Sequence, residues 1–179
     1  MARNQGRRRC LLFDWGDTLM RDFPQFDGPM FTWPRVEAVS NVKDVLAALR
    51  PGWILALATN AEASDEADIR KALERVGLNE LIEKVYCYRR IGHKKPSPEF
   101  FEYILNDLGV EPERVVMVGD DFEVDVLGAN HCGIPAVWFN ERVPRKRRIG
   151  KMYRTIDDFA ALPGELKALL SANGRLEPV

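Results

Sequence analysis

Short apolar runs alternate with amphipathic stretches along the whole chain. Each run places Val, Ile, Leu or aromatic residues at consecutive positions between polar residues or glycines. The runs are Cys10–Phe13, Trp53–Ala58, Val85–Tyr88, Val115–Val118 and Ala136–Phe139. Continuous rather than alternating apolar runs are typical of strands that are buried on both faces of a parallel sheet. We therefore predict five strands of a parallel sheet.

Helices are predicted between these runs from their end signals. Ser40, Ser64 and Ser97 stand where an N-cap is expected, and Gly77 and Gly109 stand where helices end. The predicted helices are Ser40–Leu49, Ser64–Gly77, Ser97–Leu108, Glu123–His131 and Asp157–Leu170. Repeated strand–helix units predict a doubly wound, three-layer α/β/α sandwich with a central parallel sheet and right-handed crossovers.

Two segments depart from this alternation. Residues 20–39 contain an aromatic stretch from Phe23 to Trp33 and are predicted to form a short flap, whose aromatic side chains either pack over the sheet edge or contact a substrate. Residues 142–154 are basic and are predicted to form an exposed loop. The length of 179 residues suits one domain over residues 1–179. Neither the interval from Thr18 to Thr59 nor that from Asn60 to Lys95 is long enough for a separate cap domain.

Composition narrows the classes of partner. The formal net charge is −1, so the chain has no global attraction to nucleic acid or to anionic membranes, and no apolar run is long enough to span a bilayer. The basic run at 142–154 could hold a phosphate-rich partner, but such runs are usually solvated and this one lacks interleaved aromatic residues. The three cysteines follow no metal-ligand spacing, and we expect a cytoplasmic protein with reduced thiols.

Polar residues cluster where the predicted strands end. Asp14 follows the first strand, Thr59 the second and Asp120 the fourth, with Asp125 one helical turn later and Lys95 before the helix that leads into the fourth strand. Ligands of open α/β sheets bind at the carboxyl ends of the strands. Because clustered carboxylates repel one another, we expect a cation between them, and hard oxygen ligands favour Mg²⁺.

These residues resemble the motifs of a known family. Asp14 with Thr18, then Thr59, then Lys95-Pro96, and finally Gly119-Asp120 followed by Asp125 are similar in type and order to the four signatures of the haloacid dehalogenase-like superfamily. The resemblance extends from Cys10 to about Asn140. It implies a Rossmann-like fold and an Mg²⁺-dependent phosphatase that forms an aspartyl-phosphate intermediate on an unidentified phosphate ester or anhydride.

The resemblance also implies a role for each residue. Asp14 would be the nucleophile and a metal ligand, Gly16 would offer its backbone carbonyl to Mg²⁺, and Asp120 and Asp125 would complete the metal site. The phosphoryl group would be held by Thr59, Asn60 and Lys95, with Lys94 as a rival for the role of Lys95.

One position departs from the family pattern. Phosphatases of this family carry a second Asp two residues after the nucleophile as general acid, and here that position is Gly16. Asp17 is predicted as the substitute catalytic acid, provided that its turn is unusual, and His93 is a further candidate. The missing acid predicts faster turnover of aryl or acyl phosphates than of alkyl phosphates.

The same departure leaves an alternative function open. A metal- or phosphate-binding module with little turnover would fit the loss of the acid at Gly16, and a dehalogenase or phosphonatase is a third hypothesis. The sequence does not distinguish a monomer from a homo-oligomer.

Overall fold

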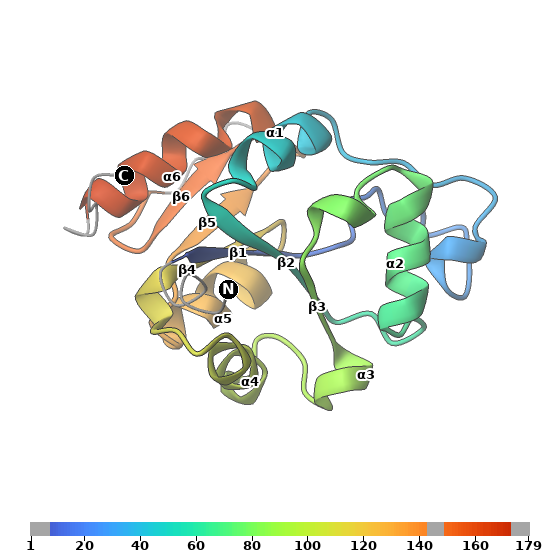
Figure 1. Ribbon diagram of the computed structural model, residues 1–179, viewed down its shortest axis with the longest axis horizontal. Coiled ribbons are helices and arrows are strands. Elements are labelled where there is room, and N and C mark those ends of the chain that lie inside the picture. The colour runs from blue at the N-terminus through green and yellow to red at the C-terminus, as the bar shows by residue number, and fades with distance from the viewer. Residues whose placement is uncertain (1–7, 143–148, 173–179) are drawn as a thin grey trace.

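The computed structural model describes residues 8–142 and 149–172. In this part of the chain six parallel strands form one sheet (Figure 1). They are β1 (Arg9–Phe13), β2 (Trp53–Thr59), β3 (Lys84–Cys87), β4 (Val115–Gly119), β5 (Ala136–Phe139) and β6 (Tyr153–Ile156). Their order is β3-β2-β1-β4-β5-β6, a doubly wound arrangement in which the direction of winding reverses between β1 and β4. The predicted parallel sheet is confirmed.

Helices cover both faces of the sheet. The α-helices are α1 (Val42–Leu49), α2 (Glu66–Arg75), α3 (Tyr88–Ile91), α4 (Pro98–Leu108), α5 (Gly128–His131) and α6 (Leu162–Ala172). The short 3-10 turns are η2 (Met30–Thr32), η3 (Asn79–Leu81), η4 (Pro112–Arg114) and η6 (Phe159–Ala161), and η5 (Phe122–Leu127) is a π-helix. No helix in the described part of the chain combines the length and apolarity that crossing a membrane requires.

Alternate residues of β1 enter two separate hydrophobic clusters. Leu11 and Phe13 pack with residues of α1, α2 and α6, whereas Cys10 and Leu12 pack with residues of α4 and α5. Figure 1 shows these two groups of helices on opposite sides of the sheet. Burial of both faces explains the continuous apolar runs of the strands and confirms the predicted three-layer sandwich.

Two predicted helix caps are wrong. Helix α1 begins after Asn41, whose backbone is left-handed, so Ser40 lies one residue outside the cap. Helix α2 is capped by Asp65, not Ser64: Asp65 accepts from the backbone of Asp68, and the Asp68 side chain accepts from the backbone of Asp65. The side chains of Asp65 and Asp68 thus form a reciprocal capping box. It satisfies two backbone N–H groups, whereas a serine cap would satisfy one.

Other boundaries also differ from the prediction. The predicted loop at 142–154 was too long, because Tyr153 and Arg154 begin the edge strand β6, which pairs with β5. Residues 143–148 of that loop lie outside the described residues. The predicted helix Glu123–His131 consists of the π-helix η5 followed by α5, and β3 ends at Cys87 because Tyr88 begins α3.

The predicted flap at 20–39 lies beside α2, in the blue part of Figure 1. A bridge between Met20 and Ala38 closes its base. Its centre is fastened to α2 by Arg75, whose Nη1 donates to the carbonyls of Phe31 at 2.9 Å and Trp33 at 2.6 Å. These contacts fix the flap on the domain. That residues 1–179 form a single domain remains a prediction.

Candidate active site

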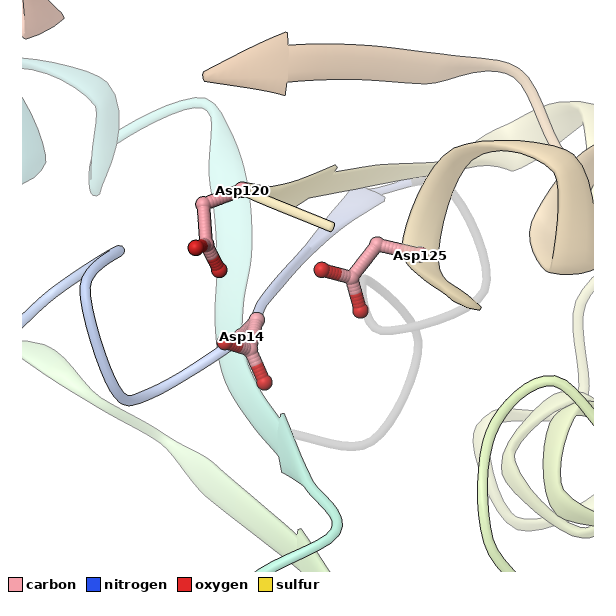
Figure 2. Close-up of side chains that lie close together, drawn as sticks. All are labelled: Asp14, Asp120 and Asp125. Atoms are coloured by element: carbon pink, nitrogen blue, oxygen red, sulfur yellow. The ribbon is translucent and has the colours of Figure 1, made fainter. Parts of the chain in front are cut away.

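Three carboxylates meet at the point where the winding of the sheet reverses. Asp14 follows β1, Asp120 follows β4, and Asp125 lies on η5. Figure 2 shows their side chains pointing toward one another, and one oxygen from each lies within 4.8 Å of the others. Asp14 and Asp120 are neighbours because β1 and β4 are paired in register, with Phe13 opposite Val118.

Lys95 is buried between two of these carboxylates. Its Nζ donates to Asp14 Oδ1 at 2.6 Å and to Asp125 Oδ1 at 2.8 Å, and the residue is 4% exposed. Burial alone would lower the pKa of Lys95, but the two carboxylates raise it above its ordinary value. Lys94, the rival, pairs with Glu62 and does not line the cavity described below. The lysine therefore stays charged and neutralises part of the cluster.

The backbone around Lys95 is held from two sides. The Asn60 side chain accepts from Lys95 N and donates to the Lys95 carbonyl, both at 2.8 Å. On the other side, a side chain at Gly128 would lie 2.7 Å from Pro96 Cβ, so glycine lets α5 pack directly against Pro96. Because both polar atoms of the Asn60 amide bind Lys95, this side chain positions the lysine. Whether it also contacts a phosphoryl group remains a prediction.

Asp125 occupies space that is available only because residue 119 is glycine. A Cβ added at Gly119 would lie 2.1 Å from Asp125 Oδ2 and 2.6 Å from Asp125 Cβ. Asp125 Oδ2 also accepts from Asp121 N at 3.1 Å. Asp125 is 1% exposed, and burial, opposed by Lys95, raises its pKa. The glycine thus brings a buried carboxylate against the end of β4.

Asp120 is oriented through its own backbone and through Thr18. Trp138 Nε1 donates to the Asp120 carbonyl at 2.8 Å. The hydroxyl of the buried Thr18 lies 3.4 Å from Asp120 Oδ1 and 3.5 Å from Asp14 Oδ2, which links the two carboxylates. Burial, with Asp14 and Asp17 nearby, raises the pKa of Asp120 to about 6. The cluster is therefore costly to ionise in the absence of a further cation.

The turn after Asp14 is unusual, which is the condition under which Asp17 was considered as a catalytic acid. Asp17 has a φ of 53°, and its carboxylate accepts from Asp22 N at 3.2 Å and pairs with Arg142.

Thr59 is buried after β2, and its Oγ1 accepts from Ala61 N at 3.1 Å, so its hydroxyl proton can be directed into the cavity. His93 is exposed, outside the residues that line the cavity.

Comparison with known proteins identifies the family. The model of haloacid dehalogenase-like hydrolases matches residues 23–133, which is more than half of the chain. The chain belongs to this hydrolase family. The resemblance drawn from the motifs is thereby confirmed.

Several proteins with sequences similar to this chain are phosphatases. The glyceraldehyde 3-phosphate phosphatase of Pyrococcus furiosus is 28% identical over 146 residues, which cover 80% of this chain and 58% of the relative. The human N-acylneuraminate-9-phosphatase is 35% identical over 109 residues, covering 59% of this chain and 43% of the relative. The chain thus matches only about half of the length of these relatives.

Solved structures share the fold over nearly the whole chain. An uncharacterized protein from Listeria monocytogenes serotype 4b has a TM-score of 0.79 and 28% identity, covering 91% of this chain and 99% of its own. A haloacid dehalogenase-like family hydrolase from Xanthomonas campestris has a TM-score of 0.72 at 16% identity, with 94% and 99% coverage. The second likeness concerns the fold alone.

A cavity of about 470 Å³ opens above the carboxylates of this hydrolase. Besides residues described above, its lining includes Asp22, Met30 and Trp33 of the flap and Glu62 of the loop after β2. Sequence reasoning assigned no role to Asp22 or Thr18. Thr18 lies within the first motif and four residues after Asp14, which was a usable signal, whereas nothing local marks Asp22.

Proposed function

We propose that this chain is an Mg²⁺-dependent phosphohydrolase that acts through an aspartyl-phosphate on Asp14. The observation that supports it most is the grouping of Asp14, Asp120 and Asp125 within 4.8 Å beside a single buried lysine. Two kinds of positive charge serve phosphoryl transfer, a metal ion and a lysine. The phosphatase names of the relatives support the same reaction class.

The donor set fits Mg²⁺. Carboxylate oxygens are hard ligands, and the raised pKa of Asp120 indicates a carboxylate whose charge is incompletely compensated by the protein itself. Asp14, Asp120, Asp125 and the carbonyl of Gly16 would hold the ion. When bound, Mg²⁺ would supply charge neutralisation for the phosphoryl oxygens and for the carboxylates. Solution binding of the ion is part of the proposal.

The bonds that form and break in the proposed reaction involve Asp14, the phosphate ester and water. Asp14 attacks phosphorus, so that one carboxylate oxygen–phosphorus bond forms as the bond to the leaving oxygen breaks with its electron pair. Lys95 and Thr59 bind the phosphoryl oxygens. Water then attacks the same phosphorus, releases inorganic phosphate and restores Asp14. A proton must reach the leaving oxygen in the first half and leave the attacking water in the second.

Asp17 is the proposed acid for this proton transfer. It lines the cavity, and its left-handed backbone gives it a direction different from that of a side chain in an ordinary turn. Its carboxylate is paired with Arg142, which competes with the leaving oxygen for this side chain. We therefore expect turnover to favour leaving groups that need little protonation, such as those of aryl and acyl phosphates.

A test with para-nitrophenyl phosphate distinguishes the enzyme from a binding module, the alternative that the glycine at position 16 favours. The wild type, Asp14→Asn and Asp27→Asn are assayed with Mg²⁺ and with a chelator. Asp27 is an exposed flap carboxylate that does not line the cavity, so it is a matched control. Turnover that needs Mg²⁺, survives in Asp27→Asn and is lost in Asp14→Asn supports the enzyme. Mg²⁺ binding by calorimetry without turnover would favour the module.

The proposal includes a phosphorylated small molecule as substrate and a cytoplasmic location. The cavity volume lies in the range of small-molecule sites. All three cysteines are free, two of them buried, which suits a reducing compartment.

A further inference from the structure

Four residues that line the cavity do not belong to the cluster of Asp14, Lys95, Asp120 and Asp125. The cavity lining includes Asp22, Met30 and Trp33 of the flap and Glu62, and we call these four residues the outer wall. The leaving group of a phosphoryl group bound at Asp14 and Lys95 would occupy other parts of the cavity, which the outer wall helps to line. The inference that follows rests on the proposed function, because it concerns the substrate of the same site.

The carboxylates that line the cavity differ in the cations and N–H donors that offset their negative charges. Asp17 pairs with Arg142, and Glu62 pairs with Lys94. Asp121 accepts from the backbone N–H groups of Glu123 and Val124 at 3.0 Å and 2.9 Å. These contacts neutralise or disperse the charge of each carboxylate.

Asp22 is compensated less than these three. Asp22 is an exposed residue, and its carboxylate forms no ion pair with the described residues, although the Phe23 backbone N–H and the more distant Arg142 offset part of its charge. Desolvation together with Asp17 raises its pKa. Its pocket neighbours Met30 and Trp33 are apolar and mostly buried, 5% and 8% exposed. A leaving group at this wall therefore meets a carboxylate that has no ion-pair partner, beside an apolar surface.

The position of Asp22 is fixed by its neighbours. Its own N–H donates to Asp17 Oδ1, and the preceding residue, Arg21, is held by a 2.8 Å bond from its N–H to the Glu37 carbonyl. A Cβ added at Gly16 would lie 3.6 Å from Asp22 Cβ and 3.9 Å from Asp22 Oδ2. Because residue 16 is glycine, no side chain at this position lies between Asp22 and the loop that follows Asp14.

We propose that Asp22 makes the site selective for phosphate monoesters whose alcohol is neutral or cationic and has an apolar part, and that it disfavours esters carrying a carboxylate or a second phosphate. Two like charges in a partly desolvated cavity repel, whereas an ammonium group would be attracted to Asp22 and to the face of an aromatic ring. One carboxylate without an ion-pair partner in the outer wall is enough to disfavour anionic esters in this way.

The test compares three aryl monoesters of similar leaving-group acidity, so that differences report recognition and not chemistry. They are para-methylphenyl phosphate, para-(aminoethyl)phenyl phosphate and para-(carboxymethyl)phenyl phosphate. In the wild type with Mg²⁺, kcat/KM should be roughly tenfold lower for the carboxymethyl ester than for the other two. Asp22→Asn should remove that gap by raising the rate of the carboxymethyl ester, and Asp27→Asn should retain it.

Several outcomes would overturn the inference. Equal kcat/KM for the three esters in the wild type would do so, as would a gap that persists in Asp22→Asn. A uniform fall for all three esters in Asp22→Asn would assign the residue to the chemical step or to the fold. If the wild type hydrolyses none of them, the proposed function has failed. Calorimetric binding of the three esters to the wild type then tests the selectivity alone, and equal affinities would refute it.

Discussion

Gly119→Ala should damage the carboxylate cluster without replacing any charged residue. The added methyl group would lie 2.1 Å from Asp125 Oδ2, 2.4 Å from Cγ and 2.6 Å from Cβ. A rotamer change can move the carboxylate but not Cβ, whose place is set by the backbone of η5. The π-helix must therefore shift away from the end of β4, or β4 must bend.

The cost of this shift follows from the contacts it breaks. Overpacking of a buried site costs about 1–3 kcal/mol. Asp125 would also leave Lys95 Nζ, now 2.8 Å away, and Asp121 N, now 3.1 Å away. Loss of one partner of a buried ion pair costs about 3–5 kcal/mol, an upper limit here because Asp14 still binds the lysine. We expect a loss of about 3 kcal/mol in the free energy of unfolding, or a fall of about 6–12 °C in Tm.

Thermal unfolding with and without Mg²⁺, together with calorimetric titration of Mg²⁺, measures both consequences. Mg²⁺ affinity should fall by about 10–100-fold, since Asp125 no longer faces Asp14 and Asp120. Gly164→Ala is the matched control, because a Cβ there meets no atom within 4 Å. Asp125→Asn separates loss of the charge from displacement of the helix. If Gly119→Ala unfolds at the wild-type temperature and binds Mg²⁺ equally well, the close packing of β4 against η5 is not as described.

Two further predictions concern ionisation and positioning. The pKa of Asp120 is raised from 3.8 to about 6, so the folded chain keeps a proton that the unfolded chain has lost, and without Mg²⁺ stability should fall as the pH rises through this range. Saturating Mg²⁺ should raise Tm by about 5–10 °C at about pH 8 and little at about pH 5; equal gains at both pH values would contradict this. Asn60→Ala should lower kcat/KM for para-nitrophenyl phosphate about 10–100-fold by releasing the Lys95 backbone, and an unchanged value would show that the lysine is held by other contacts.

The sequence predicted that Asp14 and Asp120 lie together, because the ends of neighbouring parallel strands meet at one edge of the sheet, whereas the roles of these residues remain predictions. Asp14 and Asp120 each follow a buried apolar run, and parallel pairing places such ends side by side. Lys95 was more difficult, since Lys94 has the same charge. The choice between them depends on Asn60, whose amide binds the Lys95 backbone 35 residues away in the sequence.

Other features escaped prediction because they depend on distant or competing contacts. Ser64 was a plausible cap, but Asp65 with Asp68 forms a better one. The edge strand β6 was missed because Tyr153 and Arg154 are half-buried and follow a basic run, so they lack a continuous apolar pattern. Asp22 is placed by contacts of the flap base, including the bond from Arg21 N to the Glu37 carbonyl, that no short window of sequence reveals.

The charges of the inner cluster explain why one lysine and one divalent cation belong together in the proposed site. When Asp14, Asp120 and Asp125 are ionised, Lys95 leaves two negative charges uncompensated, which is the charge that one Mg²⁺ would neutralise. Among the described residues, Lys95 Nζ binds the carboxylates of Asp14 and Asp125 but not that of Asp120, which the Thr18 hydroxyl contacts. Burial, with Asp14 and Asp17 nearby, raises the pKa of Asp120, so a cation bound there would offset the cost of its ionised form.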